Sequence, residues 1–147
     1  MSHSIEMGSH FHKARRLAKI VAPDFRIFAT ENLDPGQCVL DLRAKTIEIG
    51  ERTRELQAAA AILFQAGHLR LRTEEGFDEH FGKITIVSEK RLIKRLREQG
   101  QEADMRASDW AIEALSSNWN IDKVQAKSLI DPYVWDDTEW GSYYSGE

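Results

Sequence analysis

The longest apolar run in the chain lies between Leu56 and Leu71 and reads LQAAAAILFQAGHLRL. From Leu56 to Ala66 only Gln57 and Gln65 are polar, so a helix over these residues is apolar on nearly all sides. Helices with this pattern are buried rather than placed at the surface. The run would be about 24 Å long as a helix, and it is too short and too charged at its ends to span a membrane. We therefore expect a central buried helix and no membrane association.

Three short segments before this helix alternate apolar and polar residues, as half-buried strands do. Residues 25–29 (FRIFA) form the first, and residues 38–42 (CVLDL) and 46–49 (TIEI) form the other two. The last two are rich in β-branched residues and lie close together in the sequence, which is typical of a β-hairpin. Thr53 follows them as the expected N-cap of the central helix. The pattern therefore predicts a small antiparallel sheet that contains this hairpin.

Two further helices are expected, one on each side of this region. Residues 9–22, with Ser9 as the expected N-cap, place four large apolar side chains near one helical face: Phe11, Leu17, Ile20 and Val21. Residues 102–119, after a break at Gly100, do the same with Met105, Ile112, Leu115 and Trp119. Residues 120–129 are expected to add a short helix.

These elements predict an α+β fold in which a small antiparallel sheet packs on the buried central helix and residues 102–119 cross that helix. Residues 73–82 indicate a loop, and residues 84–87 (ITIV) indicate a short strand. We expect one domain over residues 1–130 and an acidic, aromatic C-terminal tail over residues 131–147.

Composition agrees with an ordinary globular protein. The chain has 147 residues, of which 41% are hydrophobic and 30% are charged, and a net charge of -4. The charge gives no general reason to expect nucleic acid as a partner. Cys38 is the only cysteine, so no intrachain disulfide can form, and the N-terminal residues carry no apolar signal segment. We therefore expect a cytoplasmic location.

The candidate chemistry lies near the end of the central helix. The pentapeptide FQAGH, Phe64 to His68, has the outline of the zinc-peptidase signature H-E-x-x-H with its first two letters changed. In that signature two histidines four residues apart bind zinc from one helical face. The glutamate between them acts as a general base toward the zinc-bound water.

Further segments extend this likeness. A hairpin ending in TIEIGERT runs directly into the helix carrying AGHLRL, and residues 107–115 read ASDWAIEAL. In order and spacing, residues 25–115 resemble zincin-like metallopeptidase domains, whose helix reads like HExGHLRL. The segment at 107–115 resembles both the A-A-D-Y-A-I-N segment of the metallopeptidase domains that accompany von Willebrand-type modules and the E-x-x-A-D-x-W-A segment of other zincins. The resemblance implies a zincin-like fold and a zinc site.

Carried over residue by residue, the resemblance implies a remnant site without catalysis. Phe64 stands at the first histidine position, Gln65 stands at the general-base position, and only His68 is retained. The third-ligand position corresponds to Asp109 by one alignment and to Asp104 by the other. One histidine and one carboxylate make a poor zinc site, because catalytic zinc normally has three protein ligands. We expect no cofactor, Phe64 packed in the place of the metal, and His68 bonded to an aspartate or a backbone carbonyl.

Two alternatives stay open at this point. A non-standard metal site, with zinc as its metal, would combine His68 with His80 and an aspartate in a metal-dependent hydrolase. The simpler alternative is that no ancestral site existed and that Gly67 and His68 only mark close packing near the end of a buried helix.

A basic segment suggests a different class of function. Residues 83–97 carry six cations against one acid, and Arg91, Lys94 and Arg95 are the candidate phosphate contacts on the helical face opposite Leu92 and Leu96. The first helix adds four more cations: Lys13, Arg15, Arg16 and Lys19. If the two faces were adjacent, single-stranded nucleic acid would be a plausible partner. A solvated helix face is the simpler interpretation.

The tail combines five aromatic residues with five acids and no lysine or arginine. Its aromatic side chains either pack back on the domain or bind a partner protein, for which the candidates are Trp135, Trp140, Tyr143 and Tyr144. The function we expect from the sequence is therefore a non-catalytic, metallopeptidase-like domain that acts as a protein-interaction or assembly module. Nucleic-acid binding and a non-standard metal-dependent hydrolase are the alternatives.

Overall fold

A computed structural model describes residues 8–74 and 89–134, with side chains described for residues 8–71 and 102–134. In chain order the elements are α1 (Ser9–Val21), β1 (Arg26–Thr30), β2 (Cys38–Asp41), β3 (Thr46–Gly50), α2 (Glu55–Glu74), α4 (Glu89–Trp119), α5 (Lys123–Ile130) and the 3-10 helix η2 (Asp131–Tyr133). The predicted strand at 84–87 and most of the predicted loop at 73–82 lie outside the described residues.

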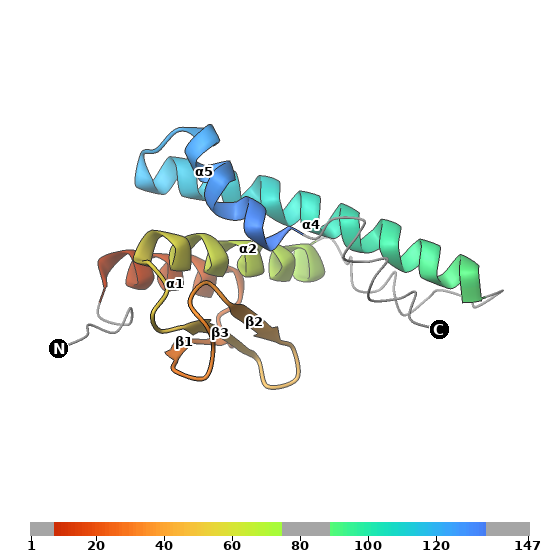
Figure 1. Cartoon of the computed structure of the whole chain (residues 1–147), viewed down its shortest axis with the longest axis horizontal. Coiled ribbons are helices and arrows are strands. Elements are labelled where there is room, and N and C mark those ends of the chain that lie inside the picture. The colour runs from red at the N-terminus through yellow and green to blue at the C-terminus, as the bar shows by residue number, and fades with distance from the viewer. Residues whose placement is uncertain (1–7, 75–88, 135–147) are drawn as a thin grey trace.

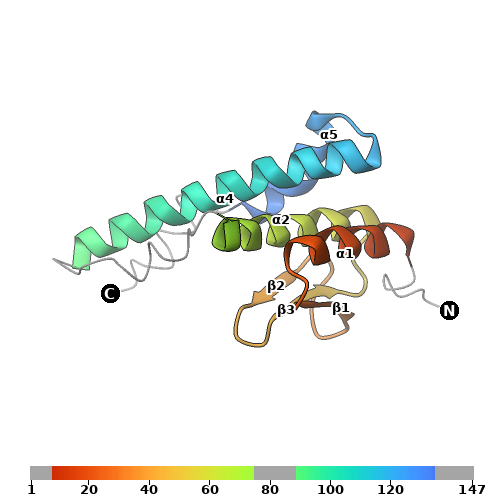
Figure 2. The same ribbon diagram turned by 180° about the vertical axis from the view of Figure 1, so that it is seen from behind.

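Helix α2 lies at the centre of the molecule. The three-stranded sheet lies on one side of it, α1 runs beside it, and α4 and α5 cover the other side (Figures 1 and 2). From Ala58 to Phe64 every residue of α2 is at most 3% exposed. The prediction of a buried central helix in an α+β fold is thus confirmed. No helix in the described ranges is long and apolar enough to cross a membrane.

The sheet has the strand order β1-β3-β2 and is mixed. Strands β2 and β3 pair antiparallel, with Leu40 opposite Ile47, so the predicted hairpin is confirmed. The expectation of a purely antiparallel sheet is wrong, because β1 pairs parallel with β3, with Ile27 opposite Ile47. The reason is that β3 carries fully buried isoleucines at both Ile47 and Ile49 and therefore takes the central place, which separates β1 from β2.

Both predicted N-caps are wrong. Gly8 occupies the N-cap position of α1 without a side-chain cap, and Ser9 is the first helical residue. Helix α2 begins at Glu55, and the Thr53 hydroxyl instead accepts a hydrogen bond from the Gly36 N–H at 2.7 Å. Thr53 therefore holds the loop before β2 in place.

The apolar faces of α1 and α4 also differ from the prediction. The predicted Phe11 and Leu115 are fully buried, and small residues fill much of the rest of the buried faces, among them Ala14, Ala18, Ala103, Ala107 and Ala111. Ile20 and Met105 point to solvent, with 78% and 63% of their surface exposed. Closely packed helices have small residues at their contact. The periodicity of large residues alone therefore wrongly predicted that Ile20 and Met105 face the core.

Helix α4 is longer than the predicted one and extends well past the rest of the described fold (Figure 1). The expected break at Gly100 is wrong, since the helix continues through it. A glycine inside a helix is about 1 kcal/mol less favourable than alanine, which a long helix tolerates. The short helix expected at residues 120–129 is confirmed as α5, whose N-cap Asp122 accepts a hydrogen bond from the Gln125 N–H.

Candidate functional site

Helices α2 and α4 approach one another closely at Gly67. A Cβ atom at this position would lie 2.8 Å from the Ala107 carbonyl oxygen and 3.0 Å from the Ala107 Cα, so only glycine fits without a backbone shift. The interpretation that Gly67 marks close packing is correct for this residue. The contact brings the next residue of α2 to the face of α4.

His68 meets Asp104 at this contact. The distance between His68 Nε2 and Asp104 Oδ1 is 2.8 Å, at which the imidazole N–H donates to the carboxylate. Asp104 is only 8% exposed, whereas Asp109 is exposed and lies on another side of α4. Of the two aspartates that the sequence left open, Asp104 is thus the one that lies beside His68.

Phe64 and Gln65 occupy the two altered positions of the signature. The Phe64 ring is 3% exposed and packs edge-on against the His68 ring, with centroids 4.9 Å apart and an interplanar angle of 84°. The same ring also stacks on Tyr133, with centroids 6.2 Å apart. Gln65 is half-buried. An aromatic ring therefore fills the space beside the remaining histidine.

Tyr133 joins the site through its hydroxyl. This group donates to the Gly36 carbonyl at 2.8 Å and accepts from Gln57 Nε2 at 3.1 Å. Gln57 Nε2 also donates to the Leu129 carbonyl at 2.9 Å. The C-terminal turn is therefore bonded both to α2 and to the loop before β2.

The sequence reasoning did not identify Gln57 or Gly36 as site residues. A signal for Gln57 was present, because it is one of two polar residues between Leu56 and Ala66 and precedes Phe64 by seven residues, which places both on one helical face. Gly36 contributes through its carbonyl and has a positive φ of 85°. In the sequence, Asp34-Pro35-Gly36 indicates only a turn.

The residues present do not fit a zinc ion. Among the described residues no group of three or more histidine, cysteine or acidic side chains is placed to hold a metal. His68 and Asp104 are one pair, Phe64 offers no ligand atom, and Gln65 has no ionisable group. His80, the residue that would complete a rebuilt site, lies outside the described residues.

The described backbone of the second basic segment, from Glu89 onward, lies far from the first basic helix. Lys13 of α1 donates to the Asn118 carbonyl and lies over the Trp119 ring, 4.6 Å from its centroid, at the C-terminal end of α4. Arg97 precedes Asn118 by 21 residues, which separates the two by about 32 Å along the helix axis. Arg91, Lys94 and Arg95 lie in the still more distant first turns of α4, and their side chains lie outside the described ones. Nucleic-acid binding stays a prediction.

The candidate partner-binding residues of the tail, Trp135, Trp140, Tyr143 and Tyr144, also lie outside the described residues. Tyr133 and Val134 are described, and both pack against the core.

No protein-family model matches this chain, and no curated protein or solved structure matches it either. These comparisons neither support nor contradict the resemblance to zincin-like domains.

Replacing Asp104 by alanine is expected to lower the free energy of unfolding more than replacing Asp109 does. Asp104→Ala should lower the free energy of unfolding by about 2 kcal/mol, because it leaves the partly buried imidazole of His68 without its carboxylate. Asp109→Ala is the matched control on the same helix and should change it by no more than about 0.5 kcal/mol. Urea denaturation of the two variants measures both values, and equal effects would contradict the pairing.

Alkaline pH is expected to destabilise the fold through two groups, the Cys38 thiol and the Tyr133 phenol. Burial raises the pKa of the Cys38 thiol from 9.0 to about 12. Burial also raises the pKa of the Tyr133 phenol, a nearby Cys38 adds to this, and the Gln57 hydrogen bond opposes it. The folded state thus holds both protons more tightly than the unfolded state does. The contribution of these two protonated groups to the free energy of unfolding is complete below about pH 9, and it is lost as the pH rises toward 12.

Urea denaturation between pH 7 and pH 10.5 tests this expectation. The free energy of unfolding should fall above pH 9 in the natural protein and fall less steeply in Cys38→Ser, which removes the thiol. An identical slope in the variant would show that the buried thiol does not contribute.

Proposed function

We propose that this chain is a non-catalytic, zincin-like domain that acts as a protein-interaction or assembly module. The observation that carries the proposal is the packing of Phe64. Its buried ring lies against the rings of both His68 and Tyr133, at the sequence position where the resemblance would put a metal ligand.

The chemistry of the altered positions supports the loss of catalysis. A phenylalanine cannot coordinate a metal, and a glutamine cannot take a proton from water near neutral pH. Asp104, which would supply the third ligand, instead accepts the hydrogen bond of His68. The polar pair is satisfied within the fold and is therefore explained as a contact between α2 and α4.

The interaction role rests on aromatic residues at the C-terminal end. Tyr133 reaches the α2 face, and the segment that follows it adds tryptophans and tyrosines, which are typical anchors of protein interfaces. The acidic residues around them would favour a partner with basic side chains near its binding surface.

Metal content and partner capture test the proposal together. Protein purified without a histidine tag or chelator is expected to contain no stoichiometric transition metal and to hydrolyse no peptide substrate with added zinc. The full chain should capture a partner that a version truncated after Val134 does not. This truncation keeps Tyr133, so its fold should be unchanged. A metal-dependent hydrolytic activity that disappears in His68→Ala would instead favour the hydrolase alternative.

A further inference from the structure

The walls around the Tyr133 side chain are fixed by contacts that do not involve it. The Gly36 N–H donates to the Thr53 hydroxyl, which is itself buried, and the Gly50 N–H donates to the Gln37 carbonyl. Phe64, the apolar wall, belongs to the most buried part of α2. The pocket formed by Gly36, Gln57 and Phe64 is therefore built by α2 and the loop before β2.

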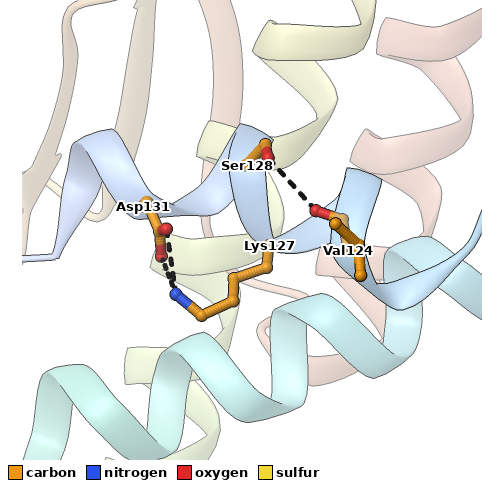
Figure 3. A network of polar contacts seen from close by, with 4 residues as sticks. All are labelled: Val124, Lys127, Ser128 and Asp131. Carbon is orange, nitrogen blue, oxygen red and sulfur yellow. Dashed lines mark hydrogen bonds and ion pairs between the residues drawn. The ribbon is translucent and has the colours of Figure 1, made fainter.

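The occupant of this pocket lies in a short segment with no buried residue, since none of the residues of η2 is buried. Its junction with α5 carries an ion pair between Lys127 and Asp131 at 2.9 Å, which Figure 3 shows beside the bond from the Ser128 hydroxyl to the Val124 carbonyl. Both partners of the pair are exposed, and such pairs contribute about 0.5 kcal/mol. Short segments without buried residues can open locally without global unfolding.

We propose that this pocket is a docking pocket for a tyrosine side chain of a partner protein, and that Tyr133 of the same chain occupies it when no partner is bound. This inference rests on the proposed interaction function and names the chemistry of its ligand. The kind of ligand follows from how Tyr133 is bound: an aromatic ring stacked on Phe64, and a hydroxyl that both donates to Gly36 and accepts from Gln57.

The same contacts exclude close relatives of tyrosine. A phenylalanine would stack on Phe64 but leave the Gly36 carbonyl without its donor. A phosphotyrosine would place negative charge against that carbonyl oxygen, which can only accept hydrogen bonds. The partner segment therefore carries an unmodified tyrosine, and it binds when η2 has moved aside.

The test uses the full chain and a peptide with the sequence of residues 130–134, acetylated and amidated, titrated by NMR. The Tyr133→Ala variant should bind this peptide at least about tenfold more tightly than the natural protein, because a tethered side chain competes at an effective concentration in the millimolar range. Peptides with phenylalanine or phosphotyrosine in place of the tyrosine should bind Tyr133→Ala about tenfold less tightly. Adding Gln57→Leu to Tyr133→Ala should also weaken binding of the tyrosine peptide.

The proposal would be overturned if the peptide bound the natural protein and Tyr133→Ala equally, or if it did not bind a folded Tyr133→Ala variant. If Tyr133→Ala does not fold, Tyr133→Phe serves instead. It keeps the ring but loses both hydrogen bonds, so it should still bind the peptide more tightly than the natural protein, and failure to do so overturns the proposal. A protein that binds no peptide but still captures a partner through residues 135–147 would disprove the pocket and leave the proposed function intact.

Discussion

Phe64→His combined with Gln65→Glu is expected to bind about one equivalent of zinc per chain, whereas we expect the natural protein to bind none. The new imidazole would take the place of a ring that now lies 4.9 Å, centroid to centroid, from His68. Asp104, at 2.8 Å from His68 Nε2, would supply the third ligand. Elemental analysis of the purified variant measures the metal, and unfolding with and without a chelator measures its contribution to stability.

Removal of the buried Phe64 ring should destabilise the metal-free double variant by about 2 kcal/mol, since histidine buries less apolar surface. Bound zinc should restore this loss, because a ligand that binds only the folded state stabilises it. The matched control adds Asp104→Ala and should lose the metal. A folded double variant that binds no zinc would show that the likeness to a peptidase helix is coincidental at this face.

Gly50→Ala is expected to lower the free energy of unfolding by about 3 kcal/mol. A Cβ atom at position 50 would lie 2.2 Å from the Asp34 carbonyl oxygen and 2.9 Å from the carbonyl carbon, and both are backbone atoms that no side-chain rotation can move. The end of β3 would have to separate from the loop before β2, which carries the carbonyl of Gly36. Thermal or urea unfolding measures the effect.

Gly36→Ala in the same loop is the matched comparison. A Cβ atom there would meet no atom within 4 Å, but the φ of 85° is strained for alanine and should cost about 1 kcal/mol. The variant at position 50 should therefore be clearly the less stable of the two. The opposite order would mean that backbone strain, rather than the contact with Asp34, limits this loop.

Much of the fold follows from local patterns in the sequence. The alanine-rich apolar run predicts the buried helix α2, and the alternation at residues 38–49 predicts the hairpin. The place of β1 could not be predicted, because its pairing with β3 depends on which strand lies at the centre of the sheet. The exposure of Met105 depends on how closely α4 approaches α2, and no single helix carries that information.

The candidate site was predictable only in part. The pentapeptide pointed to Phe64 and His68, and either an aspartate or a backbone carbonyl was expected as the partner of the histidine. The choice of Asp104 over Asp109 depends on which side of α4 faces α2. The contact of Gly67 with Ala107 determines this, and the sequence alone does not reveal it. Tyr133 was expected only as one of several aromatic tail residues, because its partners Gly36 and Gln57 lie 97 and 76 residues earlier in the chain.

This sequence separation has a consequence during protein synthesis. Gln57 precedes Tyr133 by 76 residues, so the walls of the pocket leave the ribosome before its occupant does. At about 5–20 residues per second the delay is roughly 4 to 15 s. A partner encountered by the nascent chain in that interval would compete with no tethered tyrosine, so assembly during translation would favour the complex over the self-occupied form.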